Sequence, residues 1–325
     1  MIRSSRAPAL QESALATDSA AFRAGAGGFS CRFCRTCMGR GCVGQLPGMG
    51  GVDGNANFIR NCAAWSRLYE ECARAGHGAE IDALHISAEV VGIAPVTGAV
   101  QNIGCATERD FYLPYFSAAK NAGAAVCVGD GCPDEKLLFG LEAVRTLGVP
   151  AYFFLKPYPD ERLRERLDWV RADAAAVGMD IDAYNIATMR EQVRLERKSA
   201  AQIRELRRYA GAPFMLKGIF TAEDVALCRE VRPDVAVVSN HGGRVDADAG
   251  STADFLAANR DALRDCCGEI WVDGGIRTAQ DVRTALFLGA QKALVGRPFI
   301  SALCRGGQPE MERCVRDLRG ICPSV

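Results

Sequence analysis

The six residues from Ser239 to Arg244, Ser-Asn-His-Gly-Gly-Arg, carry the side chains best suited to chemistry in this chain. His241 can take up a proton near neutral pH. Arg244 can bind a carboxylate through two parallel hydrogen bonds. The two glycines between them let a flat ligand approach the backbone. The stretch therefore indicates either an acid/base and carboxylate-binding unit or a tight loop after a strand, and the residues downstream favour the first.

Two glycine–arginine pairs follow this stretch, and each ends a short apolar run. Gly274 and Gly275 precede Arg277, and Gly296 precedes Arg297. Glycine N–H groups and arginine side chains at neighbouring strand ends suit a phosphate group. Barrels of the (β/α)8 type commonly hold phosphate at the loops after strands seven and eight. The spacing therefore predicts a phosphate site near the C-terminus.

Eight apolar runs alternate with amphipathic stretches from about residue 88 onward. They cover residues 90–94, 124–128, 151–155, 175–179, 214–216, 235–238, 270–272 and 293–295. Such runs are typical of parallel strands that are buried on both faces. Capping sequences at Thr221 and Thr278 start two of the helices between them. The pattern predicts a (β/α)8 barrel over 88–325. An open doubly wound sheet is the alternative. The sequence lacks the early glycine-rich dinucleotide-binding motif that such a sheet often carries, which favours the barrel.

Composition excludes several functions. The chain has 39 basic and 39 acidic residues, which gives no electrostatic case for nucleic acid or a membrane surface. No apolar run is long enough to cross a bilayer, and the N-terminus lacks the apolar core of a signal peptide. The fifteen cysteines of the chain are therefore expected to be mostly reduced thiols, which predicts a cytoplasmic protein.

Residues 1–87 precede the barrel and are expected to form an arm and a cysteine-rich segment. Cys31, Cys34, Cys37 and Cys42 lie within a dozen residues. Four thiolates this close suit a metal better than disulfides. A [4Fe–4S] cluster or a zinc ion fits the set, and a loop with free thiols is the alternative. We also expect this segment to cap the barrel mouth.

The C-terminal third resembles the FMN-dependent α-hydroxy acid oxidases and dehydrogenases, the family of glycolate oxidase, lactate oxidase and mandelate dehydrogenase. Four motifs in order carry the resemblance: 217–219 (Lys-Gly-Ile), 239–244, 273–277 (Asp-Gly-Gly-Ile-Arg) and 296–298 (Gly-Arg-Pro). It is fainter over 88–210 and fails over roughly the first 85 residues. The motifs are specific for the family's fold and flavin site, and less so for its substrate.

The resemblance implies an enzyme that oxidises a small 2-hydroxy carboxylate to the 2-oxo acid. His241 would be the base, Asp182 its carboxylate partner, and a hydride would pass to flavin N5. Arg244 would bind the substrate carboxylate, and Lys217 would stabilise the reduced flavin at N1 and O2. The other FMN contacts would be Ala94, Pro95, Val96, Gly129, Ser239, Asp273, Gly274, Gly275, Arg277, Gly296 and Arg297.

The chain departs from the family around the substrate. After Asp182 there is no second arginine until Arg190. The third strand ends near Lys156, where the family has Gln and Tyr, and 180–182 reads Asp-Ile-Asp instead of Thr-Val-Asp. Lys156 is therefore either a substitute contact for the substrate carboxylate or a solvated loop lysine.

Two other functions also fit the sequence. FMN-dependent isomerases of the isopentenyl diphosphate type use the same barrel, but they lack the His-Gly-Gly-Arg unit. A flavin- or metal-binding protein without 2-hydroxy acid turnover is the other. For the enzyme, the electron acceptor is unknown. A metal cluster near the flavin would favour a dehydrogenase over an oxidase. Homo-oligomers are common in the family, which is an analogy only.

Overall fold

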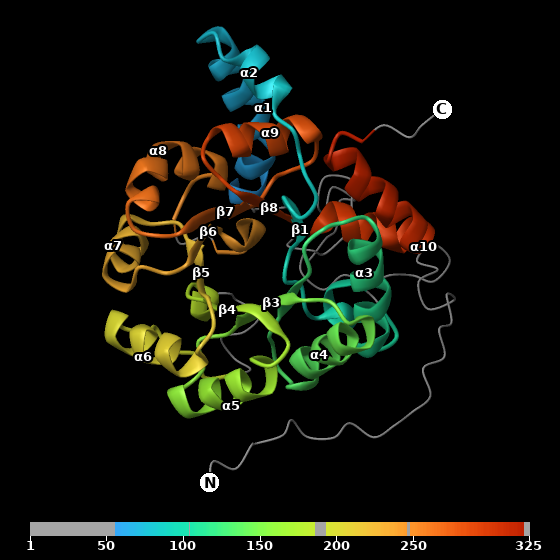
Figure 1. Cartoon of the computed structure of the whole chain (residues 1–325), viewed down its shortest axis with the longest axis vertical. Helices are drawn as coiled ribbons and strands as arrows, with labels where there is room; N and C mark the ends of the chain where they lie inside the picture. The colour runs from blue at the N-terminus through green and yellow to red at the C-terminus, as the bar shows by residue number, and fades with distance from the viewer. Residues whose placement is uncertain (1–55, 104, 186–192, 246–247, 322–325) are drawn as a thin grey trace.

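A computed structural model of the chain describes residues 56–103, 105–185, 193–245 and 248–321. Its centre is a barrel of parallel strands (Figure 1). The strands are β1 (Val91–Ile93), β2 (Cys127–Gly129), β3 (Ala151–Leu155), β4 (Ala174–Asp180), β5 (Phe214–Ile219), β6 (Val235–Val238), β7 (Glu269–Asp273) and β8 (Lys292–Val295). All eight match a predicted apolar run. The (β/α)8 prediction is therefore confirmed.

The strand order closes the sheet into a barrel. Hydrogen-bonded neighbours run β1-β8-β7-β6-β5-β4-β3-β2. The ring is completed where β1 meets Ala125, just before β2, through hydrogen bonds from Ile93 N to Ala125 O (2.9 Å) and from Ala125 N to Val91 O (3.0 Å). Because all strands run the same way, their carboxyl ends meet at one mouth, where barrels of this type carry their active sites.

Helices surround the barrel and alternate with its strands (Figure 1). They are α1 (Ala56–Arg74), α2 (Gly78–Ala83), α3 (Arg109–Asn121), α4 (Glu135–Leu147), α5 (Asp160–Val170), α6 (Ala200–Ala210), α7 (Ala222–Val231), α8 (Thr252–Arg264), α9 (Ala279–Phe287) and α10 (Arg297–Leu318). Short helical turns lie at η2 (Ala99–Ile103), η3 (Ala183–Asn185) and η4 (His241–Gly243). None of the helices described here is long and apolar enough to cross a membrane.

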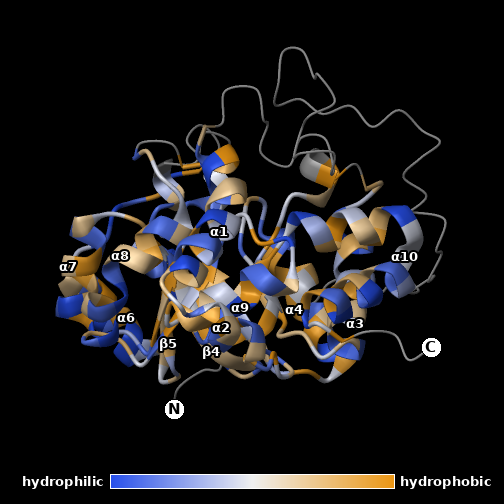
Figure 2. Cartoon of the chain, turned by 90° about the horizontal axis from the view of Figure 1, so that it is seen from above, coloured by the Kyte–Doolittle hydropathy of each residue, from blue (hydrophilic) through white to orange (hydrophobic). Residues whose placement is uncertain are grey.

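Local sequence explains where the helices begin. The Thr221 side chain accepts a hydrogen bond from the Asp224 N–H, and the Asp224 carboxylate accepts one from the Thr221 N–H. Thr278 and Asp281 form the same reciprocal pair at the next such helix. Both predicted caps are therefore present. In Figure 2 the helices of the outer ring carry both hydrophilic and hydrophobic residues. Such two-faced helices cover the sheet with one side and meet water with the other.

The described part of the N-terminal segment packs against the barrel. Helix α1 lies beside α8, α9 and η4. Phe58 and Trp65 on this helix are buried, as are Asn57 and Asn61. Helix α1 therefore lies at the mouth, next to the turn that contains His241.

Candidate active site

The turn after β6 presents His241 in a strained backbone conformation. His241, Gly242 and Gly243 have φ angles of 52°, 63° and 92°. Side chains disfavour this left-handed region, and non-glycine residues found there are often functional. The Asn240 side chain stabilises the turn by accepting a hydrogen bond from Gly243 N (2.9 Å). The His241 N–H donates to the Ser239 hydroxyl (3.1 Å). The two glycines thus allow a turn that the neighbouring polar side chains hold in place.

His241 pairs with Asp182, as the sequence predicts. Its Nδ1 lies 2.6 Å from Asp182 Oδ2. Because a carboxylate can only accept, Nδ1 carries the hydrogen of this bond, and the ring turns its Nε2 away from Asp182. Among the described residues, Nε2 has no hydrogen-bond partner. An imidazole that a carboxylate orients in this way can act as a general base.

Asp180 lies at the centre of the mouth and is not among the site residues predicted from sequence. Its Oδ2 lies 2.6 Å from Lys156 Nζ, and its Oδ1 lies 3.1 Å from Lys217 Nζ. Its Oδ2 also lies 3.6 Å from His241 Nε2. Burial alone would raise the pKa of Asp180. Lys156, Lys217 and His241 oppose this and lower its pKa well below the usual range. Asp180 is therefore a buried carboxylate shared by two ammonium groups.

Lys217 is held between two carboxylates. Besides Asp180, Asp273 Oδ2 lies 3.6 Å from its Nζ. Burial favours the neutral amine, but Asp180 and then Asp273 raise the pKa of Lys217 above its ordinary value. Ser239 donates to the same Asp273 oxygen (2.6 Å). Lys217 is thus a permanent cation at the mouth, where a negative ligand would be stabilised.

Lys156 is buried, which excludes one of the two interpretations made from the sequence. Its side chain is 9% exposed and paired with Asp180. The Lys156 N–H also donates to buried Asp130 (3.0 Å). The interpretation of Lys156 as a solvated loop lysine is therefore wrong. Lys156 belongs to the group of charges around His241.

The two arginines predicted to bind phosphate lie after the ends of β7 and β8. The Arg297 guanidinium stacks 4.0 Å from the centre of the Phe58 ring and donates to Gly242 O (2.9 Å). Arg277 lies 5.9 Å from the same ring, and its Nη2 has no hydrogen-bond partner among the described residues. A buried donor without a partner is unfavourable unless a ligand satisfies it. The two arginines thus fit an anionic phosphate.

The remaining predicted flavin contacts lie nearby. A Cβ atom added at Gly296 would lie 3.4 Å from Ala94 Cβ and 3.6 Å from the Val96 side chain. One added at Gly129 would lie only 2.4 Å from Pro95 O. These strand ends therefore form one surface of small residues at the mouth. With Lys217 and the two arginines, this surface can accommodate a flat ring and an anionic phosphate, so the residues present fit FMN.

Helix α1 supplies three residues that sequence reasoning missed. Asn61 exchanges side-chain hydrogen bonds with Asn240 (2.8 and 3.2 Å) and accepts from Thr252 N (3.0 Å). Trp65 donates to Gly274 O (2.8 Å). Asn57 donates to Asp248 O (2.7 Å). The signal was a spacing of four residues, Asn57-x3-Asn61-x3-Trp65, which places all three on one helix face.

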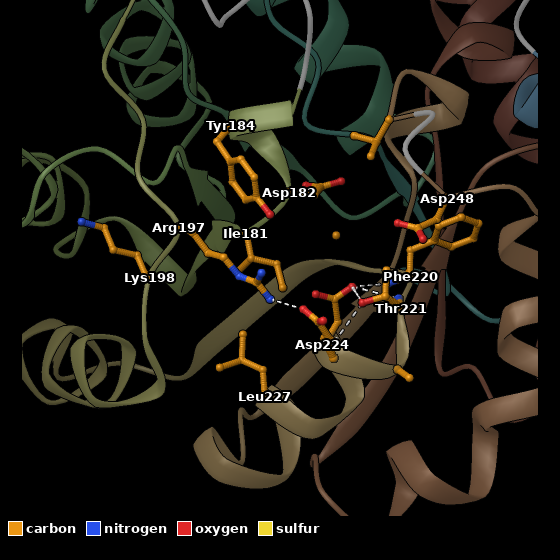
Figure 3. Close-up of a pocket in the computed structure, with 14 residues that line it drawn as sticks. Ile181, Asp182, Tyr184, Arg197, Lys198, Phe220, Thr221, Asp224, Leu227 and Asp248 are labelled. Carbon is orange, nitrogen blue, oxygen red and sulfur yellow. Dashed lines mark hydrogen bonds and ion pairs between the residues drawn. The ribbon is translucent and has the colours of Figure 1, made fainter.

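A pocket of about 400 Å³ opens beside Asp182 (Figure 3). Tyr184, Arg197, Phe220 and Asp248 are among its lining residues. The Asp182 side chain is 11% exposed, whereas that of Asp180 is 2% exposed. Asp182 thus meets water on its pocket side while it orients His241.

Asp180, Asp182 and His241 lie close enough together to share a metal ion. Two lysines already neutralise Asp180, which disfavours a further cation there. Arg244 follows the His241 turn and is half-buried. The predicted metal ligands Cys31, Cys34, Cys37 and Cys42, and also Arg190, lie outside the described residues.

Comparisons with known proteins agree with this geometry. The family model for FMN-dependent dehydrogenases matches residues 151–320. An FMN-dependent alpha-hydroxy acid dehydrogenase of Penicillium citrinum is 44% identical over 33% of this chain and 26% of its own length. A 4-hydroxymandelate oxidase of Amycolatopsis orientalis is 37% identical over 38% of this chain and 37% of its own length. The chain thus spans well under half the length of these curated relatives in the matches.

A solved structure of mandelate oxidase with (S)-4-hydroxymandelic acid has the same fold. Its TM-score is 0.63 at 22% identity, and the match covers 87% of this chain and 92% of that chain. The match is longer than the sequence similarity, so the fold extends beyond the segment that the family model covers.

Proposed function

The chain belongs to the FMN-dependent dehydrogenase family, and from this we propose that it oxidises a small 2-hydroxy carboxylate to the 2-oxo acid. The observation that carries the proposal is the His241 side chain. Its Nδ1 is held by Asp182, and its Nε2 makes no hydrogen bond among the described residues but lies 3.6 Å from Asp180 Oδ2. A base of this kind at a barrel mouth suits removal of a hydroxyl proton.

FMN, when bound, would supply the two-electron acceptor. Lys217 would lie against the flavin ring and stabilise its negative charge after reduction, while Arg277 and Arg297 would hold the phosphate. Gly274, Gly275 and Gly296 would offer backbone N–H groups at the same place.

The chemistry of the substrate follows from the side chains. The substrate hydroxyl proton passes to His241 Nε2, and Asp182 stabilises the imidazolium that results. The hydrogen on the substrate carbon leaves with both electrons of its bond, and the C–O bond becomes a carbonyl. Arg244 and Lys156 hold the carboxylate so that this carbon faces the flavin.

Changing His241 to Ala tests the base. We expect the variant to keep FMN and to lose roughly 10²- to 10⁴-fold in the rate of flavin reduction. The measurement is anaerobic rapid mixing with a panel of 2-hydroxy acids, followed by flavin bleaching at visible wavelengths. His77, which is half-exposed and pairs with Glu80 on α2, provides a matched control. The H77A variant should reduce its flavin at the wild-type rate.

Two results would overturn the proposal. Normal flavin reduction in H241A would remove His241 as the base. A wild-type protein that takes up FMN but is bleached by no 2-hydroxy acid would instead favour a flavin-binding protein without this turnover.

We also propose a metal site at Cys31, Cys34, Cys37 and Cys42, with [4Fe–4S] or zinc as its occupant. A cluster there would supply a one-electron outlet for a dehydrogenase. Iron, zinc and sulfide analysis of protein purified without oxygen is the test. The C34S/C37S variant should lose the metal and reoxidise more slowly, and unchanged metal content with unchanged reoxidation would contradict the site.

A cytoplasmic location is part of the same proposal. All ten cysteines among the described residues are free thiols. Free thiols in this number suit a reducing compartment. Fractionation of the native cells would test it, and recovery in an extracellular fraction would count against it.

A further inference from the structure

Asp180 is a buried carboxylate that the proposed reaction does not use. It ends β4 and is paired in register with Lys217 on β5. Its residue exposure is 1%. A buried charge is unfavourable unless it is paired, so its partners define what it does.

Besides His241, it has two lysine partners, and these lie on opposite sides of it. Lys156 follows β3 and approaches Oδ2, while Lys217 on β5 approaches Oδ1. Lys156 is the substrate-side lysine and Lys217 the flavin-side lysine of the proposed function. Asp180 therefore connects the cation that meets the substrate with the cation that meets the flavin.

Two positions at which this chain departs from the family lie in contact with each other. The resemblance expects Gln and Tyr where the third strand ends and Thr at position 180. This chain has Lys156 and Asp180 instead. The new cation and the new anion contact each other at 2.6 Å. They add no net charge, so the two changes compensate each other.

We propose that Asp180 is a positioning residue that, together with Lys156, sets the reduction potential of bound FMN through Lys217. This inference rests on the proposed function. Asp180 holds both ammonium groups at fixed places and offsets part of the positive charge next to the flavin. Lys156 restores that charge, which keeps the mouth positive enough for an anionic flavin and a carboxylate substrate.

The sign of each charge gives the expected direction. The D180N variant loses a negative charge beside Lys217, which favours the anionic reduced flavin and raises the potential. The K156Q variant loses a positive charge and lowers the potential. The K156Q/D180N double variant loses both and returns close to wild type. A tenfold change in the two-electron equilibrium, about 30 mV, is expected for each single variant.

The experiment measures the flavin midpoint potential of the four holoproteins by anaerobic titration against a reference dye. Lys292 provides a matched control. It is another buried lysine, but it starts β8 at the other end of the barrel, where it lies 5.1 Å from the Trp271 ring. The K292Q variant should lose stability and keep the wild-type potential.

Thermal unfolding of the same variants checks the pair without relying on flavin. Each single change leaves a charge short of a partner, so the double variant should lose less in Tm than the two singles added together. If D180N fails to fold, K156Q and the double variant still give the downward shift and its reversal.

Several outcomes would overturn the inference. Potentials that move the same way in both single variants, or that do not move, contradict a role based on charge. Additive losses in Tm contradict the pair. Failure of this inference alone leaves H241A unable to reduce a bound flavin. A wild-type protein that takes up no FMN overturns the proposed function and this role with it.

Discussion

After β6 and β7, backbone turns with positive φ angles place the functional groups, whereas at the ends of β3, β4 and β5 buried ion pairs hold them. His241, Gly274 and Gly275 have positive φ angles, and their turns are stabilised mainly by neutral hydrogen bonds. Asp180 and Lys217 depend on charge. The first side is expected to be sensitive to an added methyl group, and the second to a lost or titrated charge.

The largest effect on the ion-pair side is expected from Lys217. K217M removes the cation proposed to stabilise reduced FMN and leaves Asp180 and Asp273 with one partner fewer. The rate of flavin reduction should fall by about a hundredfold or more. Stopped-flow reduction measures it. The K217R variant keeps the charge and should recover part of the rate, so an equal loss in both would mean that shape, and not charge, matters.

The matching change on the backbone side is Gly275→Ala. The new methyl would lie 1.9 Å from Asn61 O, at a φ of 80°. Strain and overpacking should together lower the free energy of unfolding by about 3 kcal/mol or more. Urea unfolding measures this loss.

Gly211 separates the two causes. It has a φ of 61° with nothing within 4 Å of an added Cβ. The G211A variant should therefore lose only about 1 kcal/mol, from the backbone conformation alone. Equal losses in G211A and G275A would mean that the contact between α1 and the β7 turn is not tight.

The smallest expected effect is the contribution of Asp180 to the pH dependence of the free energy of unfolding. The depressed pKa of Asp180 means that its contribution to stability is fully present above about pH 3.9, its value in an unfolded chain. It is lost as pH falls through the lower folded-state pKa. Between these values wild type should lose up to about 1.4 kcal/mol more per pH unit than D180N.

Urea unfolding at pH 7, 4 and 3 measures this difference. Burial raises the pKa of Asp130, which contributes in the opposite sense, but it does so in both proteins and cancels. Parallel stability curves for wild type and D180N would contradict the depressed pKa.

The backbone side could be predicted from sequence because glycines mark it. Asn240 is followed by His241 and two glycines at a strand end, and such residues in order identify both a turn and its chemistry. The eight strands were equally visible, since a strand buried on both faces needs an unbroken apolar run.

The ion-pair side could be predicted only in part. Asp182 was found by resemblance, but the contact between Lys156 and Asp180 joins two strands 24 residues apart. Only the barrel register brings them together, and a single sequence does not give register at side-chain precision. The role of helix α1 was missed for a similar reason. The spacing of Asn57, Asn61 and Trp65 defines a helix face, but it does not identify the distant residues that pack against that face.

The packing of α1 has a consequence for how the chain folds. Asn61 and Trp65 find partners 179 and 209 residues later. A chain made from its N-terminus therefore presents this helix long before β6 and β7 exist. Contacts so distant in sequence form late and slowly. Until then the aromatic face of Phe58 and Trp65 stays without its partners, so the His241 turn should be among the last parts of the molecule to become native.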